Sequence, residues 1–390
     1  MGSVVQHFSR IPNMKIGVNG RNLVPSFTGI GRYVLEMCRH LVAKGHEIVL
    51  YLPEKPSFPL PEWPGTTVRI GNHAGAIRRL IWGQMVLPQL AAGDGLDVFW
   101  GPAHRLPLYL NQRIPRVVTI HDLVWMDAAS TMRFQTWLGE RILMKPAVYG
   151  ADKVVTVSSA TAEAVKIAFP AAAEKVSVVR SGLTLLSGNF TKESFAAFAQ
   201  SHRIDRPYAL FVGTLEPRKN LPRLLEAYSR LSVKVRGELL LVIAGGQGWR
   251  LANLTTLISQ LGIEASVRLT GYVTDGDLAG LYANARFLVM PSLYEGFGLP
   301  IIEANAMGIP VLASNTSSMP EVAGDAALLV DPQDVDALTC AMCRLASDEH
   351  LLRHLAARSR LNAARFDWHK SAAEMIRIFE DVIAMRNKYR

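Results

Sequence analysis

Two carboxylates frame a glycine-rich segment, E-G-F-G-L-P-I-I-E, at residues 295–303. The apolar run before it predicts a strand over 287–292, and Pro300 is typical of the first turn of a helix. Glu295 would then lie on the strand-to-helix loop, and Glu303 one turn into the helix. In open parallel sheets, ligands bind beside such loops, at the carboxyl ends of the strands. The spacing therefore predicts a ligand site with an acidic group at each end.

The backbone between the two carboxylates suits an anion. Gly296 and Gly298 let the chain approach a ligand closely, and the N–H groups of Gly298 and Leu299 at the helix N-terminus can bind a diphosphate. Glu303 can accept hydrogen bonds from the paired hydroxyls of a ribose, while Glu295 faces the other end of the same ligand. Sugar, diphosphate and ribose in this order describe a nucleotide sugar. For this segment alone, a helix cap with a salt-bridging glutamate is the alternative.

Two cations follow the first predicted strand of the second half of the chain. The segment G-T-L-E-P-R-K-N at 213–220 places Arg218 and Lys219 just past that strand, on the edge where Glu295 emerges. Cations are unfavourable at a helix N-terminus, so their position favours a ligand over a solvated pair. Two fixed positive charges can neutralise a diphosphate leaving group, as a divalent metal ion does in other enzymes.

The first half of the chain has weaker signals of the same kind. In F-T-G-I-G-R-Y at 27–33, Gly29 and Gly31 form a turn before an amphipathic helix and would bring the backbone close to the sugar phosphate or to an acceptor. His121, in H-D-L after another predicted strand, can orient a sugar hydroxyl or share a proton. A structural role is equally compatible with this histidine.

Strand-like apolar runs alternate with helical stretches along the chain. Runs that are apolar throughout are typical of strands buried on both faces, and so of parallel sheets between helices. The predicted fold class is α/β, with two doubly wound, Rossmann-like domains. We expect strands at 14–20, 47–52, 67–70, 97–100, 116–121, 153–158, 176–179, 208–213, 239–245, 267–271, 287–292, 310–314 and 327–330.

The domain boundaries follow from composition. The stretch 187–207 is polar and carries no strand pattern, so it is interpreted as a linker between domains at 14–190 and 205–367. The first would bind the acceptor and the second the nucleotide sugar. After residue 348 the pattern is helical, with an interruption at R-F-D-W (365–368). We expect the final helix, 370–390, to cross back and pack on the first domain.

The composition excludes several classes of protein. The net charge of +9 lies mostly in the N-terminal half, but Lys and Arg are scattered rather than clustered, which argues against a nucleic-acid partner. No window holds the roughly 18 apolar residues of a membrane span, and the first 13 residues lack a signal-peptide core, so we expect a cytoplasmic chain. With three cysteines and no second ligand pair beside C-A-M-C (340–343), neither a disulfide framework nor a metal site is expected.

Together these segments resemble glycosyltransferase family 4, over nearly the whole chain. The Glu-x7-Glu segment, G-T-L-E-P-R-K-N and S-N-T-S-S-M-P-E-V-A-G-D-A-A-L-L-V-D-P (314–332) make the match specific. The resemblance implies the GT-B architecture, in which two Rossmann-like domains face each other across a cleft, and transfer of a hexose with retention, without metal or cofactor. Within the family the chain looks most like bacterial mannosyltransferases of O-antigen and exopolysaccharide synthesis, whose usual donor is GDP-mannose.

The resemblance also implies roles for single residues. Lys219 and Arg218 would hold the donor diphosphate, Glu303 the ribose, and Glu295 the sugar, with His121 reaching the sugar from the first domain. Many family members carry Arg where this chain has Thr214, so Arg218 is expected to supply that cation. The implied catalytic residues are Glu295, His121 and Lys219; the implied donor contacts are Arg218, Lys219, Gly246, Tyr272, Val273, Glu295, Gly296, Phe297, Gly298, Leu299 and Glu303, with Tyr272 and Val273 at the base.

The acceptor would fall to the first domain. Segments 78–90 and 133–146 combine cations with Trp82, Trp137 and aliphatic residues, so they could lie on an anionic membrane surface and receive a polyprenyl-diphosphate-linked saccharide. The chain would then be peripheral at the inner face of the cytoplasmic membrane. Ordinary helix packing explains the same pattern.

Three other functions remain open on the sequence. The donor could be another UDP- or dTDP-sugar. A nucleotide-sugar 2-epimerase shares the architecture and would convert the donor without an acceptor. The third is a carbohydrate-binding protein on a decayed transferase fold. The presence of Lys219, Glu295 and Glu303 argues against it, because buried charges without a ligand cost stability.

Overall fold

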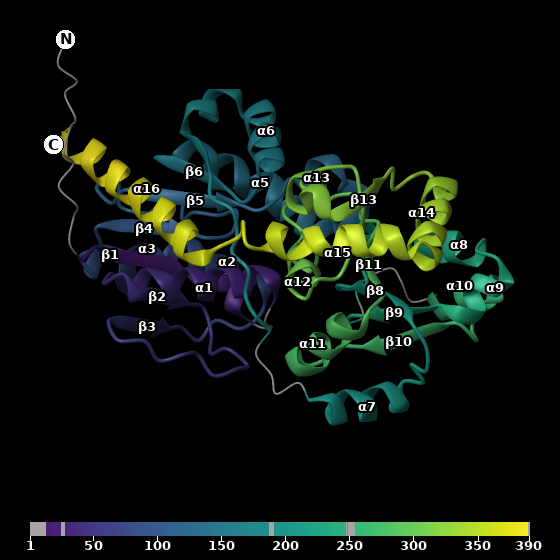
Figure 1. Cartoon of the computed structure of the whole chain (residues 1–390). Coiled ribbons are helices and arrows are strands. Elements are labelled where there is room, and N and C mark those ends of the chain that lie inside the picture. The colour runs from purple at the N-terminus through teal and green to yellow at the C-terminus, as the bar shows by residue number, and fades with distance from the viewer. Residues whose placement is uncertain (1–12, 25–27, 187–190, 247, 249–253, 389–390) are drawn as a thin grey trace, which may run out of the picture.

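Two parallel β-sheets, each covered by helices, form two lobes in this computed structural model (Figure 1). The structure describes residues 13–24, 28–186, 191–246, 248 and 254–388. Several predictions fall partly outside these ranges: the absence of a signal-peptide core in the first 13 residues, Phe27 of the first glycine-rich turn, positions 187–190 of the linker, and the last two residues of the final helix.

The first sheet has the strand order β3-β2-β1-β4-β5-β6-β7, and every neighbouring pair is parallel. From β1 the strand order runs through β2 to β3 at one edge of the sheet, and the chain then crosses over to β4 on the other side of β1. The loops after β1 and β4 therefore diverge at this point of the sheet. Ligands bind at such switch points. The strands are β1 Lys15–Asn19, β2 Glu47–Leu52, β3 Thr66–Ile70, β4 Val98–Gly101, β5 Arg116–Ile120, β6 Lys153–Thr156 and β7 Val176–Val178.

The second sheet repeats this arrangement with the order β10-β9-β8-β11-β12-β13, again all parallel. Its switch point lies between β8 and β11, the strands that precede Arg218 and Glu295. The strands are β8 Tyr208–Val212, β9 Leu240–Ala244, β10 Val267–Gly271, β11 Phe287–Met290, β12 Val311–Ser314 and β13 Ala327–Val330.

The predicted double burial of the strands holds for the sheet centres and fails at the edge strands β3, β7, β10 and β13, most strongly at β3. Residues of β4, β5, β9, β11 and β12 are buried throughout. Strand β3 is exposed along most of its length, with Ile70 at 52% exposure. It pairs only with β2 within the described part of the sheet. An edge strand lacks a neighbour to help cover its side chains, and a short apolar run does not reveal this position.

Helices of the first domain cover both faces of its sheet. Helix α1 starts at the glycine-rich turn, where the Thr28 hydroxyl accepts a hydrogen bond from the Gly31 N–H at 3.3 Å. The helices are α1 Gly29–Ala43, α2 Ala76–Ile81, the π-helical turn Trp82–Val86, α3 Leu87–Gly93, α4 Val124–Asp127, α5 Phe134–Gly150 and α6 Ser159–Ala168, with short 3-10 turns at Arg21–Leu23, Ala129–Thr131 and Pro170–Lys175.

The helices between residues 192 and 363 belong to the second half of the chain, and α7 lies inside the stretch interpreted as a linker. Helix α7 packs against α11, while the domain boundaries at 190 and 205 stay predictions. The helices are α7 Lys192–Ser201, α8 Leu221–Ser229, α9 Val233–Glu238, α10 Leu254–Gln260, α11 Asp275–Asn284, α12 Leu299–Ala306, α13 Met319–Ala323, α14 Val335–Ser347 and α15 Glu349–Ala363, with 3-10 turns at Pro217–Lys219 and Gly324–Ala326.

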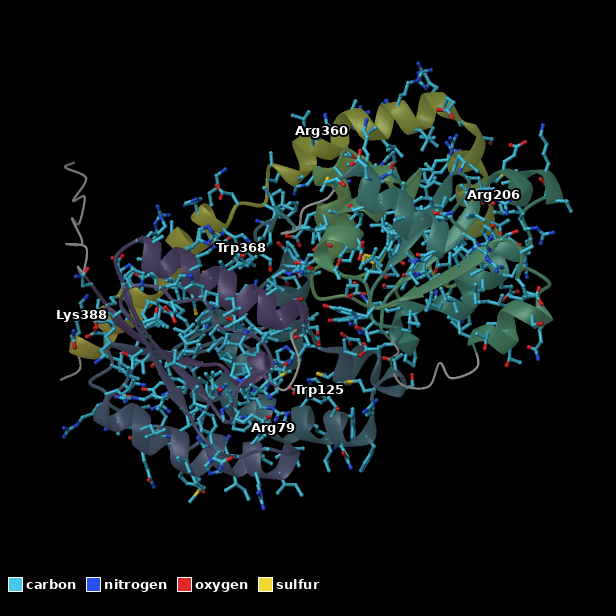
Figure 2. The ribbon with its side chains drawn as sticks, turned by 90° about the horizontal axis from the view of Figure 1, so that it is seen from below. Arg79, Trp125, Arg206, Arg360, Trp368 and Lys388 are labelled. Atoms are coloured by element: carbon cyan, nitrogen blue, oxygen red, sulfur yellow. The ribbon has the colours of Figure 1, made fainter. Side chains whose placement is uncertain are left out.

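The last helix, α16 (Trp368–Lys388), returns to the first domain as predicted and packs on α1 and β4 (Figure 1). Trp368 marks the crossing point (Figure 2), where its indole N–H donates to the Thr184 hydroxyl at 3.0 Å. A Cβ atom on Gly182 would lie 2.5 Å from the backbone nitrogen of Trp368, so only glycine fits there. Near the other end, Arg386 pairs with Asp152 at 2.8 Å.

One apolar cluster is continuous through both domains. It includes the α1 face of the first sheet, the inner face of α16, and the α11–α12 face of the second sheet. Continuous burial of this kind supports a closed arrangement of the domains. Among the described helices, none combines the length and the apolar character that crossing a bilayer would require.

Candidate functional site

Glu295 is the centre of an ion triplet at the switch point of the second sheet. Its two carboxylate oxygens are held separately, one by the Arg218 guanidinium at 2.7 Å and the other by the Lys219 ammonium at 2.5 Å. Arg218 also pairs with Glu216 at 3.0 Å. The structure thus brings together three residues that the sequence predicted on one edge, 76 and 77 positions apart along the chain.

The loop after β8 is built to present these cations. Gly213 has a φ of +148°, and a Cβ there would lie 3.3 Å from the Lys219 side chain. Asn220 adopts the left-handed conformation, with a φ of 60°, and its amide donates to the carbonyls of Pro291 and Pro332 at 3.0 and 2.7 Å. These bonds tie the loop to its neighbours after β11 and β13. The cations are therefore held by backbone geometry rather than by their own side chains alone.

Burial and charge act in opposite directions on Glu295. Burial acts to raise the pKa of this carboxyl, but Arg218 and Lys219 outweigh burial and hold the pKa at about 2. Burial also lowers the pKa of Lys219 against the pull of Glu295. The 2.5 Å contact between the two is that of a charged pair, and we treat both groups as ionised. Arg218, Lys219 and Glu295, counted without Glu216, then carry a net positive charge.

The loop between the two carboxylates touches the first domain. A Cβ on Gly296 would lie 1.9 Å from the carbonyl oxygen of His121, and the Ser158 hydroxyl donates to the Gly296 carbonyl at 2.8 Å. Gly298 has a φ of +109° and precedes α12, whose second residue is Pro300 as expected. Leu299 lies against Gly29 of the first domain: a Cβ on Gly29 would be 3.6 Å from Cδ1 of Leu299.

Within the second domain the same loop is held from behind. Ser318, in the segment S-N-T-S-S, donates from its hydroxyl to the carbonyls of Glu295 and Phe297 at 2.9 and 2.8 Å. Across the interface, Glu321 pairs with Arg180 at 2.7 Å and accepts from the backbone N–H of Ser159 at 2.8 Å. The domains are closed on each other around the predicted donor loop.

Glu303 lies at the other end of the loop and is also satisfied by protein groups. One oxygen accepts from the Tyr282 hydroxyl at 2.8 Å, and the other from Arg32 of α1 at 3.3 Å. Burial raises the pKa of Glu303, with Arg32 and Tyr282 opposing it. Arg32 also pairs with Asp275 at 3.0 Å, so one guanidinium of the first domain bridges two acids of the second.

His121 is buried and neutral, and its hydrogen bonds fix its tautomer. Nε2 lies 2.7 Å from the carbonyl oxygen of Pro102, which can only accept, so the proton is on Nε2. Burial, together with His104, lowers the pKa of His121 to about 3. The ring therefore keeps one lone pair, on Nδ1, for a ligand. Of the two roles that the sequence left open, this favours accepting a bond from a hydroxyl.

A second histidine supports His121 from below. The backbone N–H of His121 donates to Nε2 of His104 at 3.0 Å, which leaves the His104 proton on Nδ1, 3.2 Å from Glu140. Arg105 binds the other oxygen of Glu140 at 2.8 Å. His104 has a φ of 62°, an uncommon conformation for a side-chain-bearing residue that often occurs at functional sites.

Other predicted donor residues lie at the rim rather than in the ion triplet. Tyr272 is 84% exposed after β10, and Val273 follows it half-buried. A Cβ on Gly246 would meet nothing within 4 Å, so a side chain would have room at that position. At Gly245 and Gly248 only glycine fits, because a Cβ would collide with the backbone oxygens of Gly213 and Leu215 respectively. No bond links these residues to Glu295 among the described contacts. Their role at a nucleotide base stays a prediction.

Some residues at the site carried no sequence signal. Arg32 and Tyr282 lie on helices at ordinary helical spacing, and His104 and Glu140 come from a loop and a helix on either side of His121 in the chain. Arg32 is part of the quoted segment 27–33 and Glu140 of the segment 133–146, but neither was predicted to contact the site. In contrast, Trp82, predicted as a surface residue in one alternative, is 1% exposed and belongs to the core of the first domain. That part of the membrane interpretation is wrong.

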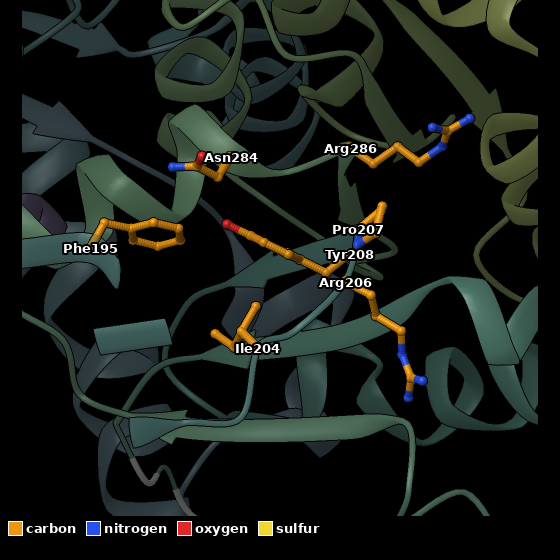
Figure 3. A pocket seen from close by; sticks show the side chains of 7 residues that line it. All are labelled: Phe195, Ile204, Arg206, Pro207, Tyr208, Asn284 and Arg286. Carbon is orange, nitrogen blue, oxygen red and sulfur yellow. The ribbon is translucent and has the colours of Figure 1, made fainter. Parts of the chain in front are cut away.

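A hollow of about 380 Å³ lies away from this site, beside α7 (Figure 3). Tyr208 and Arg286 place it at the amino ends of β8 and β11, the edge opposite Glu295. Its two guanidinium groups are used by protein partners: Arg286 binds Glu349, and Arg206 binds the Ala265 carbonyl. Its remaining lining residues are Phe195, Ile204, Pro207 and Asn284. We assign no donor binding to it.

Comparison with known proteins gives a consistent result. The family described as Glycosyl transferases group 1 matches residues 194–382, and Glycosyltransferase Family 4 matches residues 27–185. O-antigen chain mannosyltransferase B of Escherichia coli is 31% identical over 373 residues, which cover 90% of this chain and 96% of that protein. An MMP alpha-(1->4)-mannosyltransferase of Mycolicibacterium hassiacum is 32% identical over 69% of this chain and 66% of that protein.

Solved structures agree in fold. Sucrose-phosphate synthase from Thermosynechococcus elongatus aligns with a TM-score of 0.78 at 22% identity, covering 96% of this chain and 100% of that chain. HepE of Anabaena, in complex with UDP-glucose, aligns with a TM-score of 0.73 at 19% identity, over 93% of this chain and 99% of that chain. These likenesses confirm the predicted GT-B architecture. By its sequence matches along both domains, the chain belongs to glycosyltransferase family 4 and is a glycosyltransferase.

Proposed function

We propose that the protein transfers mannose from GDP-mannose, with retention of configuration, to a saccharide acceptor in polysaccharide or O-antigen synthesis. The observation that carries this proposal is the ion triplet, in which Arg218 and Lys219 hold Glu295 at the switch point of the second sheet. The choice of mannose is supported by the 31% identity to an O-antigen chain mannosyltransferase over most of both chains.

The donor diphosphate would lie against Arg218 and Lys219. A guanidinium has five N–H donors and an ammonium three, so both can keep Glu295 and still donate to phosphate oxygens. Because the cations are already fixed by the β8 loop, little reorganisation is needed when negative charge develops on the leaving group. Glu295, ionised by the same cations, would accept hydrogen bonds from the hydroxyls of the sugar.

The transfer step follows from these positions. The bond from the anomeric carbon to the diphosphate oxygen breaks, and the acceptor hydroxyl oxygen bonds to the same face of that carbon. The acceptor's proton passes to the departing phosphate oxygen, so charge and atoms balance without a protein nucleophile. His121, neutral with a free lone pair on Nδ1, would orient a hydroxyl of the sugar from the first domain. Closure of the domains would exclude water.

The roles are tested by Lys219→Met and Glu295→Gln, which keep the size of each side chain. We expect both to lower transfer by at least about a hundredfold, in line with loss of a fixed transition-state charge. Lys166→Met, which removes an exposed lysine paired with Glu163, is the matched control. Folded variants of Lys219 or Glu295 that transfer mannose at the wild-type rate would refute the assignment. The anomeric configuration of the product, read by NMR, tests retention.

The nature of the donor is tested separately. GDP-mannose, UDP-glucose and a dTDP-sugar should be compared by their effect on the melting temperature, since a ligand that binds only the native state stabilises it. The UDP-glucose complex of the Anabaena structure makes a UDP-sugar the second candidate. Stabilisation by a UDP-sugar alone would overturn GDP-mannose. Conversion of the donor to an epimer in the absence of any acceptor would instead indicate a 2-epimerase.

We further propose that the first domain meets an anionic membrane that presents a lipid-linked acceptor. Support comes from two helices with exposed apolar side chains beside cations: Ile77 of α2 is 74% exposed next to Arg78, and Phe134 of α5 is 70% exposed next to Arg133. Apolar contact and attraction to anionic lipid act together on such surfaces.

This membrane contact is measured by sedimentation with vesicles of phosphatidylglycerol and phosphatidylcholine at low salt. We expect binding that requires phosphatidylglycerol and that falls several-fold in the double variant Ile77→Ser, Phe134→Ser. Val233→Ser, at a 78% exposed position in the second domain, serves as the control. Equal binding by the double variant and the control would contradict the proposed surface.

A further inference from the structure

The contact between Arg32 and Glu303 joins two domains at the carboxylate assigned to the donor ribose. Arg32 lies in the first turn of α1, next to Gly31, and Glu303 lies on α12, 271 positions later. The Arg32 side chain is 19% exposed, and its guanidinium reaches Glu303 at 3.3 Å and Asp275 at 3.0 Å. Removing the charges of an arginine and two acids from water at a domain interface costs free energy. The contact therefore calls for a functional explanation.

The hydrogen-bond pattern leaves Glu303 half available. A carboxylate offers about four lone-pair positions, two on each oxygen. Arg32 occupies a position on one oxygen, and the Tyr282 hydroxyl, at 2.8 Å, occupies a position on the other. One lone pair on each oxygen is therefore left. Two neighbouring acceptors with fixed orientation match the two donors of a vicinal diol.

The charges around Glu303 point the same way. Burial raises its pKa, and Asp275 on α11 adds a like charge that acts in the same direction. The opposing groups are Arg32 from α1 and the Tyr282 hydroxyl from α11. Arg32 is the cation among these neighbours, and it neutralises Asp275 as well as facing Glu303. If Glu303 took up a proton, one of its acceptor positions would become a donor and the match to a diol would be lost.

We propose that Arg32 is a positioning residue that completes the ribose subsite from the first domain, by orienting Glu303 for the vicinal diol of a bound nucleoside diphosphate. This rests on the proposed function, in which Glu303 binds the ribose. It adds that the second domain alone does not present a finished ribose subsite. Closure supplies Arg32, and so donor recognition and domain closure are the same event.

A latch that merely holds the domains together would behave differently. Its loss would weaken binding of every nucleotide alike, whether or not the ligand carries a diol. A positioning role predicts a selective loss, confined to ligands with the 2′ and 3′ hydroxyls. The two roles are therefore separated by comparing GDP with 2′,3′-dideoxy-GDP on the same variants.

The experiment measures Kd for both nucleotides by calorimetry with the full-length protein. In the wild type, GDP should bind at least about tenfold more tightly than the dideoxy ligand, because hydrogen bonds to a charged acceptor are lost with the diol. Glu303→Gln should reduce this ratio. Arg32→Ala should reduce it to a similar extent, and Arg32→Lys should restore part of it. Arg39→Ala, on the same helix but exposed and paired with Glu36, should keep the wild-type ratio.

A pH series gives a second, independent readout. Because the diol needs ionised Glu303, GDP affinity should fall as the pH drops through the pKa of this carboxyl. Arg32→Ala should move this fall to higher pH. Asp275→Asn removes the like charge and should move it to lower pH. Opposite shifts from substitutions in two domains are not expected of a latch, and Asp275→Asn remains informative if Arg32→Ala fails to fold.

The outcomes separate the two levels of inference. If the wild type binds neither GDP nor UDP, or if Glu303→Gln leaves the diol ratio intact, the proposed ribose site is wrong and this inference falls with it. If Glu303→Gln abolishes the ratio while Arg32→Ala keeps both the ratio and the pH profile, the ribose site stands and the role of Arg32 is refuted. Selective loss of the ratio in Arg32→Ala, with opposite pH shifts, supports it.

Discussion

Gly296 and His121 approach so closely that a Cβ on the glycine would lie 1.9 Å from the histidine carbonyl oxygen. The loop after β11 and the loop after β5 therefore meet with no space for a side chain. The contact joins the predicted donor loop of one domain to the candidate sugar-binding residue of the other. It sets how far the domains can close.

Gly296→Ala should prevent this closure while leaving each domain folded, because the obstacle is backbone rather than a movable side chain. We expect kcat/KM to fall by at least about a hundredfold, as misplacement by about 1 Å can do. Small-angle scattering should show a larger radius of gyration than in the wild type. Gly237→Ala, in α9 with nothing within 4 Å of the added Cβ, is the matched control and should be neutral. Wild-type turnover by Gly296→Ala would contradict the closed geometry.

Glu295 should make stability depend on pH in a defined window. Its pKa is about 2 in the folded protein against 4.5 ordinarily, so its stabilising contribution is complete above 4.5 and is lost as the pH falls toward 2. The destabilisation caused by Glu295→Gln should therefore be about 2 kcal/mol smaller at pH 3 than at pH 7. Urea unfolding of both proteins at each pH measures this. A pH-independent difference would show that the carboxylate is not held by its cations.

His121 should stay neutral in the folded protein across the physiological range. Its folded pKa of about 3 lies below the ordinary value of 6.5, so stability is lost as the pH falls from 6.5 toward 3, where only the unfolded chain takes up the proton. Nitrogen-15 NMR should find the proton on Nε2 and none on Nδ1 between pH 5 and pH 8. Glu140→Gln should leave this tautomer unchanged, because the Pro102 carbonyl fixes it. A titration of His121 near pH 6.5 would refute the buried, neutral assignment.

Gly182→Ala should loosen the last helix from the first domain. The new Cβ would lie 2.5 Å from the Trp368 nitrogen, and overpacking of this kind costs about 1–3 kcal/mol. Thermal unfolding should show the loss, and limited proteolysis should cut near the start of α16. Gly150→Ala, at the end of α5 with open space around it, is the control. Equal stability of the two variants would mean that α16 does not depend on this contact.

The sequence was sufficient for much of the fold because the information is local. All the predicted strands are present with ends within two residues, since continuous apolar runs between helical stretches mark buried parallel strands. The meeting of Arg218, Lys219 and Glu295 was also predictable, because the ends of neighbouring parallel strands share an edge. The break in the pattern at 365–368 also predicted a separate final helix, which was expected to return to the first domain and does so.

Contacts between the domains were beyond such reasoning. Arg32 reaches Glu303 only because the two domains dock in one particular orientation. The local spacing of residues within each domain does not encode that orientation. The burial of Trp82 and the exposure of β3 likewise depend on which neighbour each element has in space. The role of His104 under His121 depends on a left-handed backbone conformation that no residue type in that segment signals.

The return of α16 to the first domain has a consequence for biosynthesis. Phe379 of α16 packs against Trp100 of β4, with ring centroids 6.3 Å apart, so part of the interior of the amino-terminal lobe comes from residues translated near the end. On the ribosome, that lobe keeps an uncovered apolar face while the second lobe emerges and folds. Such a nascent intermediate is the kind of species that chaperones recognise, and folding of the two lobes should complete in a single late step.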